Sequence, residues 1–310
     1  MGLSAGIVGL PNVGKSTILN ALTGAQNAEA ESYPFCTIEP NRAVVPVPDE
    51  RLEKIADITN PEKVTPTTVE FVDIAGLVEN ASQGEGLGNQ FLAHVAETDA
   101  LVHVVRCFED EDVAHVSGEL DPVRDIQVVE TELILRDIEL LEGRIEKLEK
   151  RARAEKEARP ILEAAENLLA HLEDGNPASA FPERSSERMR PIFEEVPFVT
   201  DKPVIYLANI GEETAGEGDA CAGAIRKYAA GRDRAILTIE AQIEEELIGM
   251  EEEERREFLQ LYGIEERSLN RLIRVGYRTL GLISFFTIQS NQVQAWTVGR
   301  GCGAARAAGQ

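Results

Sequence analysis

The stretch that decides the fold is GLPNVGKS, residues 9–16. It matches the pattern GxxxxGK[ST] in full, and it lies between an apolar run over residues 3–9 and a helical pattern over residues 15–22. Strand, glycine-rich loop and helix in this order are the context in which the pattern forms a phosphate-binding loop. Backbone N–H groups and the helix N-terminus then supply partial positive charge for phosphate oxygens.

Each residue type in this loop has a chemical reason. Gly9 and Gly14 permit the tight turn, Lys15 brings a full positive charge to the β- and γ-phosphates, and Ser16 offers an oxygen to Mg²⁺. Lys15 is therefore also a candidate catalytic residue, because it neutralises charge during phosphoryl transfer. The residues predicted to contact the nucleotide here are Asn12, Val13, Gly14, Lys15, Ser16 and Thr17.

Two further segments have the residues that switch-type nucleotide hydrolases use around Mg²⁺. Residues 73–76 read DIAG, a DxxG pattern at the end of an apolar strand. We expect Asp73 to hold Mg²⁺ through water and the Gly76 N–H to contact the γ-phosphate. Thr37, in the loop over residues 33–40, is predicted to coordinate Mg²⁺ only when a triphosphate is bound.

The base-recognition segment is altered. Residues 209–212 read NIGE after an apolar strand, where GTPases place Asn-Lys-x-Asp and the Asp accepts two N–H donors of guanine. Here the Lys is absent and Glu212 replaces the Asp, while Asn209 and Ile210 remain candidate nucleotide contacts. Adenine presents an unprotonated N1 at that edge, which repels a carboxylate. The sequence favours ATP and leaves GTP as the alternative.

Leu77 follows Gly76, at the position where Ras-type GTPases keep a glutamine that orients the attacking water. A leucine cannot do this, and losing such a group costs on the order of 10³–10⁵ in rate. Hydrolysis is therefore either slow or assisted by another group. A regulatory scaffold that binds nucleotide without turning it over is one alternative. A small-molecule kinase is a weaker one, because the sequence shows no separate lid for an acceptor.

Buried strands are expected over residues 69–73, 100–105 and 203–208, and they alternate with helical stretches. This alternation predicts an α/β fold with a mostly parallel sheet. Between residues 125 and 159 the apolar residues follow a heptad. They are Ile134, Ile138, Leu141, Ile145 and Leu148. A second stripe over residues 161–172 ends at a Gly-Asn-Pro break, so we predict an inserted antiparallel helical hairpin.

Two more helices are expected over residues 243–262 and 269–280. Residues 283–296 alternate like β structure, with too few residues after them to close a sheet.

The net charge of −24 excludes a protein that coats nucleic acid non-specifically, so any RNA contact requires a local basic patch. One candidate is a row of arginines on one predicted helix face, and another is the basic stretch over residues 144–159, with intrahelical ion pairs as the alternative for both. The row comprises Arg267, Arg271, Arg274 and Arg278. No sequence-specific DNA partner is expected.

Neither a membrane partner nor a bonded cysteine framework is expected. No apolar run approaches the ~20 residues of a membrane span. Four cysteines are scattered without CxxC spacing, which favours reduced thiols and a cytoplasmic protein.

Several strings together resemble the YchF / Obg-like ATPase family over essentially the whole chain. They are GIVGLPNVGKST at 6–17, FVDIAGLV at 71–78, GEGLGNQFL at 84–92 and HVVRCF at 103–108. The resemblance implies ATP preferred over GTP, Mg²⁺ dependence, K⁺ stimulation linked to Asn12, and association with ribosomes. It also implies that His115 on a mobile loop replaces the missing glutamine.

The resemblance further implies a domain organisation. A G domain over residues 1–124 and 199–281 would be interrupted by a coiled-coil insertion at 125–198. Residues 282–310 would be a shortened TGS-like segment, because the family's TGS domain is longer than what remains of the chain here.

Overall fold

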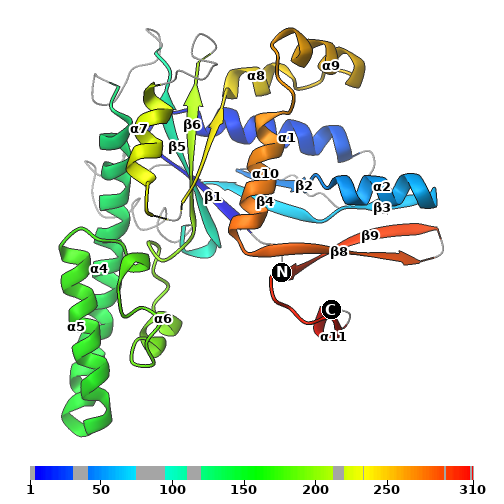
Figure 1. Ribbon diagram of the computed structural model, residues 1–310. Coiled ribbons are helices and arrows are strands. Elements are labelled where there is room, and N and C mark those ends of the chain that lie inside the picture. The colour runs from blue at the N-terminus through cyan, green and yellow to red at the C-terminus, as the bar shows by residue number, and fades with distance from the viewer. Residues whose placement is uncertain are drawn as a thin grey trace. The chain divides into compact units, whose positions relative to one another are not determined.

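The computed structural model describes residues 4–30, 41–74, 95–109, 120–211, 220–232, 234–289, 291–307 and 309 (Figure 1). The chain divides into two compact units. The first contains Met1–Ala75, Thr98–Pro122 and Pro203–Gln310, and the second contains Gly76–Glu97 and Val123–Lys202.

The first unit is built on a six-stranded sheet of order β2-β4-β1-β5-β6-β7. Its strands are β1 (Ser4–Val8), β2 (Arg42–Pro46), β4 (Thr68–Asp73), β5 (Ala100–Cys107), β6 (Val204–Ile210) and β7 (Ala235–Ile239). All neighbours pair in parallel except β2, which runs antiparallel to β4. The predicted α/β fold with a mostly parallel sheet is confirmed. Because β1 and β5 are buried along their whole length, they are mostly apolar rather than alternating, with His103 and Arg106 as the buried polar residues of β5.

The helices of the first unit are α1 (Lys15–Ala30), α2 (Glu50–Thr59), α7 (Ala220–Ala229), α8 (Ala241–Glu246), α9 (Glu252–Leu261), α10 (Ser268–Thr279) and α11 (Ala304–Ala307). Of these, α1, α7 and α10 pack on strands of the six-stranded sheet. The predicted single helix over residues 243–262 is wrong. The chain leaves the helical path after Glu246, and Gly249 has a φ of +81° that breaks the helix before α9 begins.

A second, three-stranded sheet of order β3-β9-β8 completes the first unit. Strands β8 (Leu282–Gln289) and β9 (Gln292–Gly299) form an antiparallel hairpin, and β3 (Lys63–Thr65) adds to β9 in parallel. The expected β structure near the C-terminus is confirmed. The expectation that too few residues remain to close a sheet is wrong, because the third strand comes from a segment more than 200 residues earlier in the chain.

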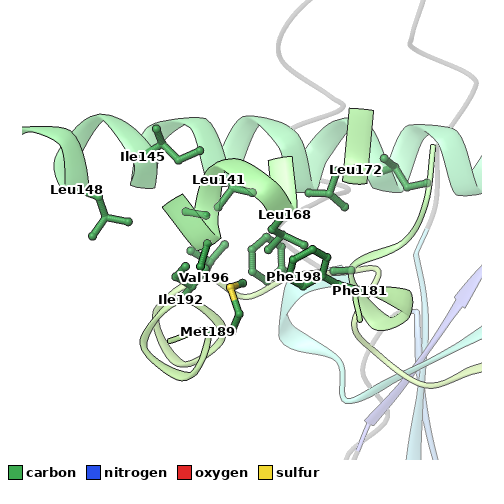
Figure 2. Close-up of a cluster of buried hydrophobic side chains, with 14 residues drawn as sticks. Leu141, Ile145, Leu148, Leu168, Leu172, Phe181, Met189, Ile192, Val196 and Phe198 are labelled. Atoms are coloured by element: carbon green, nitrogen blue, oxygen red, sulfur yellow. The ribbon is translucent and has the colours of Figure 1, made fainter. Parts of the chain in front are cut away.

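The second unit contains a long helical hairpin, α4 (Pro122–Ala154) and α5 (Arg159–Glu173), with the short α6 (Arg190–Glu195) and two 3₁₀ turns, η1 (Lys156–Ala158) and η2 (Ala178–Ala180). The predicted apolar stripe of α4 is buried against α5 and α6 (Figure 2). The second stripe contributes to the same core, as do Phe181, Met189 and Phe198. The predicted helix break follows Glu173, where Gly175 takes a φ of +80° and returns its N–H to the Leu172 carbonyl.

One buried carboxylate ties the hairpin to the segment that follows α6. Asp137 of α4 is fully buried and accepts hydrogen bonds from the backbone N–H groups of Val199 and Thr200, both at 2.8 Å. The Thr200 hydroxyl donates a third, at 2.5 Å. Burial raises the pKa of Asp137 to about 6, and the three donors act in the opposite direction. Three donors on one carboxyl group fix the chain path at the base of the hairpin.

Cys107, at the end of β5, and Cys221, in the first turn of α7, form a disulfide. The expectation of reduced thiols is therefore wrong for these two residues. Their separation of 114 residues left no local spacing that a sequence pattern could detect. Cys302 is free, and Cys36 lies outside the described residues.

Replacing Cys107 with serine should lower the free energy of unfolding by about 2–4 kcal/mol under oxidising conditions, because the cross-link restricts a long loop in the unfolded chain. Urea unfolding with and without dithiothreitol measures this. Cys302→Ser is the matched control and should change nothing. A Cys107→Ser variant as stable as the wild type in the absence of reductant would contradict the prediction.

Candidate functional site

The parallel strands β1, β4, β5, β6 and β7 all end at the same edge of the six-stranded sheet. After β1 the chain forms β2 and β4 on one side of β1, and then β5, β6 and β7 on its other side. Open α/β sheets bind ligands at the point where the strand order reverses in this way. The predicted phosphate-binding loop follows β1 and leads into α1 at Lys15. The sheet therefore brings the loop, Asp73 and Asn209 to one edge.

The loop has a backbone that only certain residues can adopt. Gly14 has a φ of +98°, and a Cβ there would lie 2.3 Å from the Asn209 Nδ2 atom. Asn12 also takes a positive φ of 61°, a conformation that asparagine tolerates better than most residues. The backbone at Gly14 explains why the motif requires glycine there, and Asn12 suits its own position although the motif leaves that residue type open.

Lys15 folds back over this loop. Its Nζ donates to the carbonyl oxygens of Gly9, at 3.1 Å, and Leu10, at 2.8 Å. The ammonium group is thus held in the concave side of the loop, beside the N-terminus of α1. Positive charge from the ammonium group and from the helix N-terminus converges there, as binding of a polyphosphate requires.

Ser16 and Asp73 come together at the same edge. The Ser16 hydroxyl donates to Asp73 Oδ2 at 3.4 Å. The other carboxylate oxygen, Asp73 Oδ1, is enclosed and has no hydrogen-bond partner among the described residues. Burial raises the pKa of Asp73, while the charge of Lys15 and the Ser16 hydrogen bond lower it. An enclosed carboxylate oxygen beside a hydroxyl is a donor set that suits Mg²⁺.

The side chain of Asn209 makes two hydrogen bonds, and one of them holds the phosphate loop. Its Nδ2 donates to the Val13 carbonyl at 3.0 Å, and its Oδ1 accepts from the Ala241 N–H at 3.1 Å. The side chain is buried, so it clamps the phosphate loop to the turn after β7. The sequence analysis missed Ala241, and its only available signal is that it follows an apolar segment, residues 235–239.

Four predicted site residues, Thr37, Gly76, His115 and Glu212, lie outside the described residues, as does Leu77. Thr17 lies in the first turn of α1, and Ile210 is the last residue of β6. The structure thus groups Asn12, Val13, Gly14, Lys15, Ser16, Asp73 and Asn209 at one sheet edge.

Replacing Asn209 with alanine should weaken ATP binding roughly 10-fold, because the Val13 carbonyl and the Ala241 N–H lose their partner and the loop loses its clamp. Isothermal titration calorimetry measures this. Asn167→Ala, at an exposed position of α5, is the control and should bind ATP like the wild type. Equal ATP affinity in Asn209→Ala and the wild type would show that the clamp has no role in binding.

The sheet, the glycine-rich loop and the Ser16–Asp73 pair define a P-loop nucleotide-binding protein of the GTPase fold class. A family model described as "50S ribosome-binding GTPase" matches residues 4–137. The chain belongs to the YchF family, which confirms the resemblance found in the sequence.

The relatives match over nearly the whole chain. The "Ribosome-binding ATPase YchF" of Haemophilus ducreyi is 48% identical over 309 residues, which cover 99% of this chain and 84% of that protein. The protein of the same name from Escherichia coli O157:H7 is 45% identical over 311 residues, covering 100% of this chain and 85% of the relative. The solved structure of the Schizosaccharomyces pombe YchF GTPase is 35% identical, with a TM-score of 0.84, and the match covers 99% of this chain and 83% of that one.

Proposed function

We propose that this protein is a Mg²⁺-dependent ATPase that associates with ribosomes and works as a nucleotide-dependent switch. The observation that carries the proposal is the pairing of Ser16 with Asp73, whose second oxygen is enclosed and unpartnered beside the phosphate loop. The names of the bacterial relatives, ribosome-binding ATPases, support the partner and the nucleotide. A cytoplasmic location is part of the proposal. Among the described residues, no helix has the length and apolar character to cross a bilayer.

Mg²⁺ would be held by Ser16 and Asp73, with Thr37 joining in the triphosphate state. The ion would supply positive charge to the β- and γ-phosphate oxygens. Lys15 and the loop amides would neutralise the remaining phosphate charge and hold the phosphate chain in line for attack by water. His115 would orient this water in place of the glutamine that Leu77 replaces, and Gly76 would contact the γ-phosphate. Stimulation by K⁺ near Asn12 belongs to the same proposal.

Glu212 and Ile210 would contact the base, with ATP favoured over GTP. A GTPase remains the second candidate, because the fission-yeast relative is described as a GTPase.

We also propose the domain division at residues 124, 198 and 281, with a coiled-coil arm and a TGS-like C-terminal segment. The buried stripe of the α4–α5 hairpin and the β8–β9 hairpin support this division.

Single-turnover release of phosphate from bound [γ-³²P]ATP and [γ-³²P]GTP, with and without K⁺ and ribosomes, tests the proposal. ATP should be hydrolysed and should bind at least 10-fold more tightly than GTP, a difference of about 1.4 kcal/mol. Tighter binding of GTP would favour the GTPase. Release of phosphate from neither nucleotide would favour a regulatory scaffold that binds without turnover.

Replacing Asp73 with asparagine should remove the Mg²⁺ dependence of ATP binding, because the variant keeps the shape of the side chain and loses its charge. ATP affinity of Asp73→Asn in Mg²⁺ should fall to the value that the wild type shows in EDTA. Glu70→Gln, on the same strand and ion-paired to Arg42, is the control and should keep the full Mg²⁺ effect. A Mg²⁺ effect in Asp73→Asn as large as in the wild type would contradict the assignment.

A further inference from the structure

Strand β8 lies at an edge of the three-stranded sheet, with β9 on one side and no further strand among the described residues on the other (Figure 1). It is eight residues long, which corresponds to about 27 Å of backbone. The outward N–H and C=O groups of an edge strand are available for pairing with another strand. β8 therefore presents a row of main-chain donors and acceptors on the surface of the first unit.

The sequence of β8 contains none of the features that usually protect such an edge. Natural edge strands are short, carry charged residues or proline, or are interrupted by a bulge. β8 reads LISFFTIQ, without charge or proline. Its register with β9 is continuous from Leu282 opposite Gly299 to Gln289 opposite Gln292. A long, regular and uncharged edge is suited to the addition of a strand.

The other edge strands of the two sheets differ from β8. β3 has three residues and includes Lys63, and β2 begins with Arg42 and ends with Pro46. β7 is uncharged, but none of its five residues is exposed. In β8, by contrast, Ile283 is 39% exposed and Ile288 is 57% exposed. Among the edge strands that the structure describes, β8 is the one at which apolar side chains and an uncharged backbone edge are accessible together.

The face of the sheet beside this edge is also uncharged. Phe285 of β8 stacks on Trp296 of β9, with ring centroids 6.4 Å apart and ring planes 16° from parallel. Thr287 and Gln294 line the same groove, which has a volume of about 280 Å³. The chain as a whole has a net charge of −24, so two copies repel each other in general. At β8 two copies can meet without placing like charges opposite each other.

We propose that β8 pairs with β8 of a second copy of this chain, in antiparallel orientation about a two-fold axis. The contact is isologous, because both copies use the same strand, and it closes at two chains. An axis perpendicular to the sheet keeps the Phe285–Trp296 faces of both copies on one side. The pair forms a continuous six-stranded sheet of order β3-β9-β8-β8-β9-β3, in which β8 is no longer an edge.

The size and charge of this interface determine how the dimer should behave. A contact made by one strand pair belongs to the class of small interfaces that associate weakly and reversibly. Its main-chain hydrogen bonds join uncharged groups, whereas the repulsion between two acidic chains is screened by salt. Raising the KCl concentration should therefore strengthen the dimer, which is the reverse of the effect on a contact between opposite charges.

Sedimentation equilibrium of the full chain, over a range of protein concentrations in low and high KCl, tests this proposal. The wild type should show a monomer–dimer equilibrium that shifts towards the dimer in high KCl. Ile288→Lys places a charge on the exposed edge, and it should raise the dissociation constant of the dimer at least about 10-fold, because pairing would desolvate that charge. At concentrations where both proteins are monomeric, a similar thermal unfolding midpoint shows that the variant is folded.

The charge-matched control is Ile58→Lys, because Ile58 lies on α2 and is 83% exposed. This variant changes the net charge by the same amount as Ile288→Lys, and it should dimerise like the wild type. Hydrogen exchange read by mass spectrometry provides a second measurement. The amides of β8 should become more protected as the protein concentration rises, both in the wild type and in Ile58→Lys.

A wild type that stays monomeric at every concentration would overturn the proposal, and so would a dimer that Ile288→Lys forms as readily as the wild type. Protection of β8 that does not change with protein concentration would place any dimer contact elsewhere on the chain. Protection of β8 that appears only when ribosomes are added to a monomeric chain would assign this edge to a strand of that partner and exclude the second copy.

Discussion

Replacing Lys15 with alanine should weaken ATP binding by roughly 100-fold, because the variant loses a charged hydrogen-bond donor worth about 3 kcal/mol at the phosphates. The ammonium group is held over the loop by the Gly9 and Leu10 carbonyls, so it is already positioned before nucleotide binds. Hydrolysis should be lost along with binding, since the same charge stabilises the transferred phosphoryl group.

Equilibrium dialysis with radiolabelled ATP measures this loss, and two comparisons make it specific. Lys54→Ala removes an exposed lysine that pairs with Glu50 on α2, and its ATP affinity should match the wild type. Chemical unfolding of Lys15→Ala should remain close to wild type, because only two loop hydrogen bonds are lost. If Lys15→Ala retains wild-type ATP affinity, the loop is not the nucleotide site.

Replacing Asp137 with alanine should destabilise the second unit by about 3–5 kcal/mol at neutral pH. Two backbone N–H groups and one hydroxyl lose their acceptor in a buried place, and each unsatisfied donor carries its own desolvation cost. Hydrogen exchange read by mass spectrometry should show the loss of protection at residues 198–200 and along α4. ATP binding belongs to the first unit and should persist.

Glu146→Ala, at an exposed position of the same helix, is the control for Asp137→Ala and should keep its protection. Full protection of Val199 and Thr200 in the Asp137→Ala variant would show that these N–H groups do not depend on the carboxylate.

The stability contribution of Asp137 should also depend on pH. Its pKa is raised from 3.8 to about 6 in the folded chain, so the folded state binds the proton more tightly than the unfolded state. The associated stabilisation is complete below about pH 4 and is lost as the pH rises through 6. Relative to Asp137→Asn, the wild-type free energy of unfolding should fall by about 3 kcal/mol between about pH 4 and pH 7. A difference that does not change with pH would contradict the raised pKa.

The phosphate loop and the apolar strands were predictable because their signals are local. A glycine-rich loop between a strand and a helix can be recognised from about 20 consecutive residues. The apolar residues from Ile134 to Leu148 recur with heptad spacing along a single helix. Asp73 was predictable because it directly follows an apolar run.

The features that the sequence did not reveal depend on distant partners. Strand β3 is only three residues long and becomes a strand by pairing with β9, far along the chain. The disulfide joins residues 114 positions apart, and the clamp of Asn209 on Val13 joins residues 196 positions apart. Asp137 stands beside the heptad stripe of α4 with no pattern to mark its partners at 199 and 200. Such contacts follow from the closed fold rather than from any local periodicity.

The most direct measurement of the central claim is calorimetric titration of the wild-type chain with ATP, first in excess Mg²⁺ and then in excess EDTA. A loop that grips the phosphates together with Ser16 and Asp73 predicts saturable binding of one ATP per chain, weakened at least 10-fold by removal of the metal. No saturable binding, or the same affinity in EDTA as in Mg²⁺, would contradict a metal–nucleotide site at this edge of the sheet.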